Sequence, residues 1–347
     1  MMTVRDVLDE ALTRLASTGP EFGRGLSNHG PMAAEALVAL GRSDEVEPWL
    51  DGHLTRLDDT PARVTPITDD SWRIALGDPR RVTDWTEYLR RQLDAEPWQQ
   101  VLARWWPRLL PGIAAGATHG VIRTAHAVRS LTSATGPARH QELARGLAYW
   151  AARYQELPGV GQLSGQLPVG AALMAVPTLP DRRGGLITDQ LARLGDVEGY
   201  PAAVAAVRPA GPDVDAAIGE LIREFAAGYL RRGYAAPVAF VHTVTAPTAV
   251  RSMLPVLPQY LHRPSYDALW QVGAAIQAGY AGGYPDQPAA AEEPAGPEPA
   301  ADDLADRAVA NGDEHAVKFT EACLREWHRG RDSTFLRAAD LALTAHF

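Results

Sequence analysis

Apolar residues recur at steps of three and four along almost the whole chain, the spacing that places them on one face of an α-helix. The segment 214–229 shows this pattern most fully, with apolar positions at Val214, Ala217, Ile218, Leu221, Ile222, Phe225 and Tyr229. The alternation of apolar and polar residues between hairpin turns, which is typical of strands, is absent. Proline and glycine lie between the helical stretches, as in 157–170 and 176–185, where they end helices and start turns. The sequence therefore predicts an all-α fold with many helices of moderate length.

One segment breaks the helical pattern. Residues 282–303 are dense in Pro, Ala and Glu, a composition typical of a mobile surface loop or linker. The helices that follow it are too few to make a domain of their own, since about 45 residues bury little surface. We therefore expect these C-terminal helices to pack back onto the body of a single multi-helix domain that spans residues 1–347. Hydrophobic residues make up 46% of the chain, which is enough for a substantial core.

Charge and cysteine content exclude several classes of function. The chain carries a formal net charge of −9 and no run of basic residues, so we expect no nucleic-acid binding, which needs clustered Lys and Arg. Its one cysteine, Cys323, excludes internal disulfides and Cys-rich zinc sites and fits a reducing cytoplasm. The N-terminal segment is too acidic and interrupted for a signal peptide, and no run of about 18 apolar residues marks a membrane span. The expected location is the cytoplasm, with no membrane contact.

The chain contains a single lysine, Lys318, within “NGDEHAVKFTEACLREW” (311–327). One interpretation is a solvated helix residue left over in an arginine-rich composition. The other is that arginine cannot replace it, because arginine stays protonated in proteins whereas a buried lysine can lose its proton and become a nucleophile. Lys318 follows His315 by three residues, so the two side chains are neighbours on one face of a helix.

Five of the ten histidines lie beside helix starts or in apolar helical stretches: His29, His119, His126, His242 and His315. We expect the other five, which have polar or terminal surroundings, to be solvated: His53, His140, His262, His328 and His346. Any one histidine alone could be a satisfied core or surface residue. Several on apolar helical faces favour a metal site, because neutral imidazole is the commonest protein ligand for Zn, Fe, Cu and Ni.

The sequence positions of these histidines indicate where their side chains lie on the helices. His29 precedes Gly30 and Pro31, and proline is favoured in the first turn of a helix, so His29 should stand at a helix mouth. His119 and His126 are seven residues apart, which is two helical turns, so both face the same way about 10.5 Å apart along the axis. They could flank one centre, or one could bind the metal while the other supports it.

A carbamate would explain why lysine is kept beside a metal. A protonated lysine would be repelled by the metal ion, but a buried neutral lysine can add CO2 and become a carboxylate-like oxygen ligand. Imidazoles together with one such oxygen suit iron(II) and leave a coordination position open. The residues alone thus suggest the hypothesis of a non-haem iron site that includes Lys318.

Five blocks run through most of the chain in a fixed order: “LSNHGPMAAEALVALG”, “ATHGVIRTAHAVRSL”, “LAYWAARYQELPG”, “FVHTVTAPTAVRSMLPVLP” and “GDEHAVKFTEACLRE”. Through them the chain resembles the questin oxidase-like family. The resemblance implies a non-haem iron held by histidines and a carboxylated lysine, at the matching positions His29, His119, His126, His242, His315 and Lys318. Since about four ligands are expected, one histidine, His126 or His29, would instead orient a ligand or contact the substrate.

The resemblance also implies a reaction. Fungal members of the family act on anthraquinones and related fused rings of aromatic polyketides, some by Baeyer–Villiger-like oxygen insertion or ring opening. The leading interpretation is therefore an iron(II)-dependent oxygenase of secondary metabolism, using O2 on a polycyclic phenol or quinone and leading to C–C or ring cleavage. A quinone would first need reduction by a separate NADPH-dependent reductase, because “GVGQLSG” (159–165) has the wrong glycine spacing for a dinucleotide site.

Three residues are candidates for substrate binding. Trp150 and Tyr154 could line a pocket for a flat ring system, and Arg123 could bind a phenolate. The alternative is that the aromatic residues are core and that the arginine pairs with a carboxylate inside the helical bundle.

Two other functions remain open from the sequence. The same histidines could hold zinc or manganese in a hydrolase or lyase, because a histidine-rich site does not identify its metal. The chain could also be a non-catalytic helical binding protein with structural histidines, although inward-facing histidines without partners would cost stability.

Overall fold

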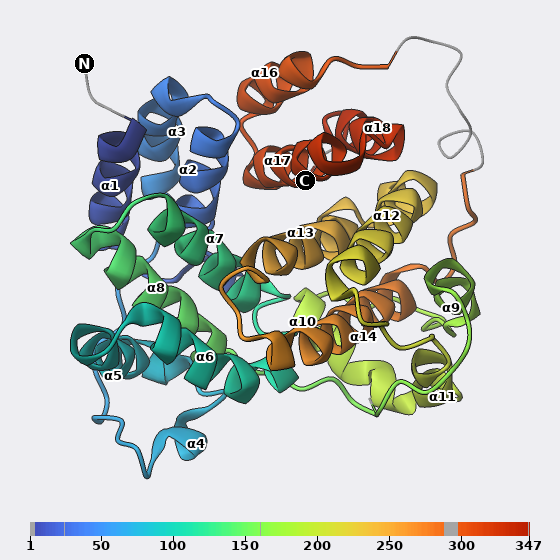
Figure 1. The fold of residues 1–347 in the computed structure, drawn as a ribbon, viewed down its shortest axis with the longest axis horizontal. Helices are drawn as coiled ribbons and strands as arrows, with labels where there is room; N and C mark the ends of the chain where they lie inside the picture. Colours follow the sequence, from blue (N-terminus) through green and yellow to red (C-terminus); the bar gives the residue numbers. More distant parts are fainter. Residues whose placement is uncertain (1–3, 24, 160, 288–297, 346) are drawn as a thin grey trace. The chain divides into compact units, whose positions relative to one another are not determined.

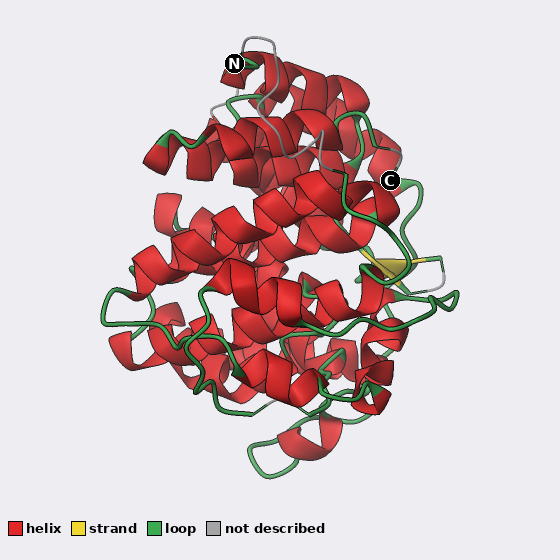
Figure 2. Cartoon of the chain, turned by 90° about the vertical axis from the view of Figure 1, so that its right-hand side faces the viewer, coloured by secondary structure: helices red, strands yellow, loops and turns green. Residues whose placement is uncertain are grey.

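The computed structural model describes residues 4–347 except Arg24, Val160, 288–297 and His346. The described residues form seventeen α-helices, short 3₁₀ turns and one two-stranded antiparallel sheet. Helices make up nearly all of the regular structure drawn in Figure 2. The predicted all-α class is confirmed. The chain divides into two compact helical units, and the expectation of one domain over 1–347 stays a prediction.

The first unit comprises the chain up to Glu156 together with Ser252–Pro258. Its elements, labelled in Figure 1 where there is room, are α1 (Val4–Leu15), β1 (Glu21–Phe22), β2 (Leu26–Ser27), α2 (Gly30–Ala39), α3 (Val46–Leu54), α4 (Trp72–Ala75), α5 (Val82–Ala95), α6 (Trp98–Leu109), α7 (His119–Ser133) and α8 (Pro137–Ala152).

The second unit comprises Leu157–Arg251 and Gln259–Phe347. Its elements are α9 (Val169–Ala175), α10 (Ile187–Ala192), α11 (Tyr200–Ala205), α12 (Val214–Arg232), α13 (Pro237–Met253, of which the last two residues belong to the first unit), α14 (His262–Tyr280), α16 (Ala301–Asn311), α17 (Glu314–Gly330) and α18 (Ser333–Ala342).

Helix α8 is central to the first unit, because both α5 and α7 pack against it. Glycines bring α7 and α8 close together: a Cβ on Gly120 would lie 2.8 Å from the Cα of Trp150, and a Cβ on Gly146 would lie 3.1 Å from the backbone of Thr124. Trp150 is fully buried there, and its Nε1 donates to the Gly112 carbonyl at 3.0 Å. This hydrogen bond ties α8 to the turn Leu110–Gly112, and the close approach at Gly120 and Gly146 sets the position of α7 against α8.

Replacing Gly120 with alanine is expected to destabilise the first unit by about 1–3 kcal/mol, the usual cost of adding a methyl group to a packed core. The nearest obstacle is the backbone and Cβ of Trp150, which no rotamer change can move. Gly52 in α3 is the matched control, because it is exposed and a Cβ there meets nothing within 4 Å; Gly52→Ala should stabilise by about 0.4–1 kcal/mol. Urea unfolding compares the two. An unchanged midpoint for Gly120→Ala would contradict the close packing of α7 on α8.

In the second unit the C-terminal helices return to the body, as the sequence predicts. Helix α18 packs on both α12 and α17, and α16 packs on α17. The predicted loop is shorter than 282–303, however, because α16 already begins at Ala301, with Asp302 and Asp303 in its first turn, where acidic side chains favour helix formation.

The start of that predicted loop is anchored to the end of α12. The Gln287 N–H donates to the Arg231 carbonyl at 3.0 Å, Arg232 pairs with Asp286, and the Tyr234 hydroxyl donates to the Pro285 carbonyl at 2.6 Å. These contacts tie the residues up to 287 to the end of α12, and the predicted mobility of the segment stays a prediction. The central part of the segment, 288–297, lies outside the described residues.

Candidate functional site

In the first unit, His29 stands at the mouth of α2, as its position before Gly30-Pro31 predicts. It is the residue that precedes the first turn, and Pro31 lies inside that turn. Asn28 fixes the backbone that leads into α2. Its Oδ1 accepts from the Gly30 N–H at 2.9 Å, and its Nδ2 donates to the Gly19 carbonyl at 2.9 Å. These bonds lock the backbone on either side of His29, which is itself buried.

His119 is the first residue of α7. The turn that precedes it, Gly116–Thr118, has an unusual backbone conformation. Gly116, Ala117 and Thr118 all have left-handed backbones, with φ of 54°, 57° and 72°. Such a conformation costs an L-residue about 1–2 kcal/mol, and for a β-branched threonine it is rare. The Gly116 carbonyl accepts from both the backbone N–H of His119, at 3.2 Å, and its Nδ1, at 2.5 Å. Strain of this kind is often found where a side chain must be held in one place.

The two histidines meet through their Nε2 atoms, which are 2.7 Å apart, with the rings 4.5 Å apart and perpendicular. Because His119 donates its Nδ1–H to a carbonyl, its Nε2 carries a lone pair. Either His29 donates a proton across the contact, or both nitrogens present lone pairs to one cation that they would bind as adjacent ligands. Two nitrogens bound to one metal at about 2.1 Å and at right angles lie about 3.0 Å apart, so the pair is close to the spacing of adjacent ligands.

Replacing Ala117 with glycine is expected to leave stability unchanged or slightly raised. Relief of about 1–2 kcal/mol of left-handed strain offsets the about 0.5–1 kcal/mol of backbone entropy that glycine loses on folding. Ala125, buried inside α7, is the control, because Ala125→Gly relieves no strain and should cost about 1 kcal/mol or more. Thermal unfolding of both variants measures the difference, and equal losses would contradict the strain at Ala117.

His126 lies two turns further along α7 and is also buried. Its Nδ1 lies 2.7 Å from Oε2 of Glu35, and the same carboxylate accepts from Arg129 Nε at 3.0 Å. His126 is therefore held by an acid–base cluster with Glu35 of α2, and its supporting role at a metal site stays a prediction. Glu35 was missed by sequence reasoning, since it is 91 residues from His126 and has no local signal.

In the second unit, His242 on α13 and His315 on α17 form another pair. Their rings are 6.1 Å apart at 81°, and His242 is buried. Asp313 caps α17: its Oδ1 accepts from the His315 backbone N–H at 2.7 Å and lies 3.1 Å from His315 Nδ1. As with His119, an oxygen acceptor on Nδ1 leaves Nε2 as the donor atom for a ligand. The sequence holds a signal for Asp313, because Asp is a preferred residue just before a helix.

Lys318 lies on α17 with only 3% of its surface exposed. Among the described residues, none forms a hydrogen bond or an ion pair with its ammonium group. Burial lowers its pKa from 10.5 to about 7, against the opposing charges of Glu314 and Asp313. The interpretation of Lys318 as a solvated surface residue is therefore wrong, and the expectation that this lysine is buried is confirmed. That it is partly neutral stays a prediction.

Two of the three candidate substrate contacts, Arg123 and Trp150, are buried and have partners inside the protein. Arg123 is buried and forms a bidentate pair with Glu142, at 2.6 and 2.9 Å, so the carboxylate partner that the sequence left open is the correct alternative. Trp150 is wholly buried and packs edge-on against Trp106 at 5.2 Å, which makes it core. Tyr154 is half-buried, with its hydroxyl on Glu156 at 2.6 Å, and its contact with substrate stays a prediction.

The expectation for the other histidines needs one correction. His53 is buried, stacked on Trp49 at 4.7 Å, and its Nε2 lies 3.3 Å from Asn28 Oδ1. Its place on the inner face of the short helix α3 explains the burial. His140 and His262 are partly exposed and His328 is exposed, whereas His346 lies outside the described residues.

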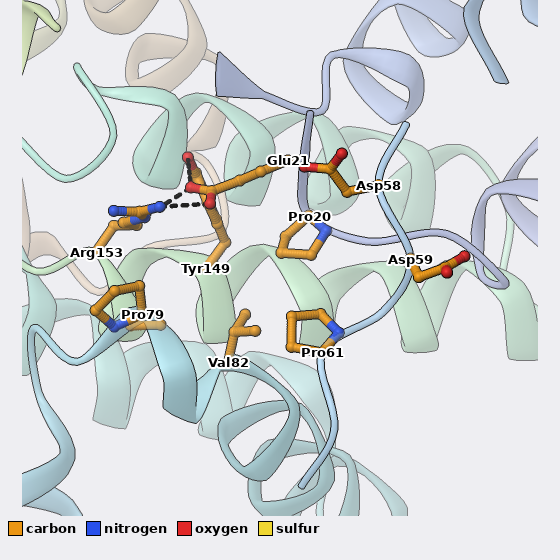
Figure 3. Close-up of a pocket in the computed structure, with 10 residues that line it drawn as sticks. Pro20, Glu21, Asp58, Asp59, Pro61, Pro79, Val82, Tyr149 and Arg153 are labelled. Atoms are coloured by element: carbon orange, nitrogen blue, oxygen red, sulfur yellow. Dashed lines mark hydrogen bonds and ion pairs between the residues drawn. The ribbon is translucent and has the colours of Figure 1, made fainter. Parts of the chain in front are cut away.

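The first unit also contains a small pocket of about 80 Å³. Figure 3 shows Pro61, Pro79 and Val82 below Glu21, Arg153 and Tyr149, and Pro20 also lines the pocket. Arg153 forms an ion pair with Glu21. The volume is too small for a fused-ring substrate, since sites for such ligands usually exceed about 300 Å³.

Comparison with known proteins gave no match to a family model and none to a curated protein. Within the part of the chain that the structure describes, no helix combines the length and the apolar character needed to cross a bilayer.

Proposed function

We propose that this protein is a non-haem iron-dependent oxygenase that acts on a polycyclic aromatic substrate of the anthraquinone or anthrahydroquinone class. The reaction would insert oxygen beside a ring carbonyl and lead to C–C or ring cleavage. The proposed ligands are those predicted from the sequence: His29, His119, His242, His315 and Lys318 as its carbamate. His126, held by Glu35, would have a supporting role.

The buried lysine carries this proposal. A buried amine with no ion pair is costly, and arginine would have served for any role on the surface. A protein keeps such a destabilising group when function requires it. A pKa of about 7 leaves a large fraction of Lys318 neutral at physiological pH, which is the form that can act as a nucleophile.

The chemistry of Lys318 then needs only CO2. The lone pair of the neutral Nζ adds to the carbon of CO2, a C–N bond forms, and one proton leaves the nitrogen for water. The product is a carbamate with a single negative charge, so a buried group that was neutral or cationic becomes an anionic oxygen donor. A cation bound beside it would offset the burial of that charge.

The histidines support the proposal through their hydrogen bonds. His119 is oriented by the Gly116 carbonyl and His315 by the Asp313 carboxylate, the outer contacts that metal-binding histidines usually make. When bound, iron(II) would supply the activation of O2 that no side chain can provide. The protein residues would orient the donor atoms and exclude water, and a quinone substrate would depend on a partner reductase that uses NADPH.

The test is oxygen uptake by protein loaded anaerobically with iron(II) and bicarbonate, then mixed with a reduced anthraquinone. The proposal expects uptake together with a product that contains oxygen from O2, and loss of both in His119→Ala. His140→Ala is the matched control, because His140 also has its Nδ1 near a backbone carbonyl, that of Gly136 at 2.9 Å, but belongs to neither histidine pair; it should retain activity.

The outcomes separate the alternatives. Tight binding of zinc or manganese with no oxygen uptake, after iron reconstitution has also failed, would move the assignment to a hydrolase or lyase. No metal binding at all would favour a non-catalytic binding protein and would overturn the proposal.

A further inference from the structure

Tyr149 on α8 lies where the two histidine-bearing segments of the first unit come together. It is 2% exposed, and it lines the pocket in Figure 3. The sticks in Figure 3 show Tyr149 beside Glu21 and Arg153, with dashed lines from Glu21 to each of the other two side chains.

On one side, the hydroxyl of Tyr149 reaches the segment before His29. It lies 2.6 Å from Ser27 Oγ and donates to Glu21 Oε1 at 3.2 Å. Ser27 and Glu21 are opposite each other in the β1–β2 pair. Since the phenolic proton goes to the carboxylate, Ser27 donates its own proton to the tyrosine oxygen. Ser27 is two residues before His29, so this bond fixes the end of the strand from which His29 emerges.

On the other side, the same hydroxyl lies against the segment before His119. A Cβ on Gly116 would be 2.7 Å from Tyr149 Oη and 2.9 Å from its ring, so the tyrosine packs directly on the left-handed turn. The carbonyl of Gly116 is the group that holds His119 Nδ1. One side chain thus contacts both backbone segments that position the histidine pair.

We propose that Tyr149 is a positioning residue that sets the spacing of His29 and His119. Its ring supports the strained turn at Gly116–Thr118, and its hydroxyl holds Ser27. The Glu21–Arg153 ion pair in turn holds the tyrosine hydroxyl. The inference rests on the proposed function only in its prediction about metal affinity, because the spacing of the two rings is a property of the metal-free protein.

The experiment compares Tyr149→Phe with the parent protein by NMR of selectively 15N-labelled histidine, without metal. The parent protein should show His119 with its proton on Nδ1 and a resolved ring resonance for His29. Tyr149→Phe keeps the ring but loses both hydroxyl contacts, so the ring-nitrogen resonances of both histidines should shift or broaden. Tyr88→Phe is the control, since Tyr88 is a buried tyrosine of the same unit whose hydroxyl bonds Asp69 at 2.6 Å, away from both segments.

Ser27→Ala is the second variant and keeps the test decisive if Tyr149→Phe folds poorly. It removes only the contact with the His29 segment, so the His29 resonance should change more than that of His119. Unchanged spectra of both histidines in either folded variant would overturn the inference. In the metal arm, Tyr149→Phe should weaken cobalt(II) binding about tenfold. A parent protein that binds no metal would defeat the proposed function but leave the NMR result on Tyr149 standing.

Discussion

Replacing Lys318 with methionine is expected to raise the free energy of unfolding of the second unit by about 5 kcal/mol at pH 6, with the gain shrinking towards zero near pH 10.5. Burial lowers the pKa of Lys318 from 10.5 to about 7, so the unfolded chain binds this proton more tightly than the folded one. Below pH 7 both states are protonated and the full penalty applies. Between pH 7 and 10.5 only the unfolded state holds the proton, so the stability of the parent protein rises with pH.

The measurement is chemical denaturation of both proteins at several pH values between 6 and 10. Because other groups also titrate in this range, the result is the difference in the free energy of unfolding between the two proteins at each pH. Lys318→Arg is the matched control: it keeps the charge buried at every pH, so it should be no more stable than the parent protein and should lose the lysine-dependent rise with pH. Parallel stability profiles for the parent protein and Lys318→Met would show that Lys318 is solvated or paired in solution.

The functional consequence of Lys318→Met runs in the opposite direction. A methionine cannot form a carbamate, so the variant should lose iron binding while it gains stability. A substitution that stabilises the protein but removes its function indicates that the original residue is retained for its function rather than for stability. Stabilisation with full retention of iron would remove Lys318 from the ligand set and leave the histidines as the only candidates.

Replacing Arg123 with methionine is expected to destabilise the first unit by about 3–5 kcal/mol, because it leaves the buried carboxylate of Glu142 without its partner. Both side chains of this pair are almost fully buried, and the two hydrogen bonds between them are 2.6 and 2.9 Å long. The pair joins α7 to α8 beside the helix contact made by Gly120. Urea denaturation measures the loss.

Two further variants identify the cause. Replacing both members, as Arg123→Met with Glu142→Leu, should recover most of the stability, because no buried charge is then unpaired. Arg90→Met, at an exposed pair with Glu87, should change little. If Arg123→Met changes the free energy of unfolding little but lowers the affinity for a phenolic substrate, Arg123 would instead be a substrate-binding residue.

The sequence predicts the helices well because the 3.6-residue period is a property of each segment alone. The same local reasoning finds His29 at a helix mouth, from Gly30 and Pro31, and Lys318 beside His315 on one helix face. These predictions need only neighbours within four residues. That Lys318 is the one lysine in the chain suggests a buried role, but this argument from composition leaves a solvated surface position open as well.

The rest depends on contacts between distant segments. Nothing near His119 in the sequence shows that Ala117 and Thr118 adopt left-handed backbones, since neither residue type favours them. Likewise the partner of Arg123 could not be chosen among many carboxylates, and Tyr149 is indistinguishable from other aromatic residues in a helix. Such features arise where tertiary packing overrides local preference.

The most direct test of the central claim is the metal content of the parent protein purified without chelators, with and without reconstitution by iron(II) and bicarbonate, measured by inductively coupled plasma mass spectrometry. We predict about one iron per chain, and none in Lys318→Met under the same conditions. No iron in the parent protein after reconstitution would contradict the proposed centre, and equal iron in both proteins would contradict the role of the lysine.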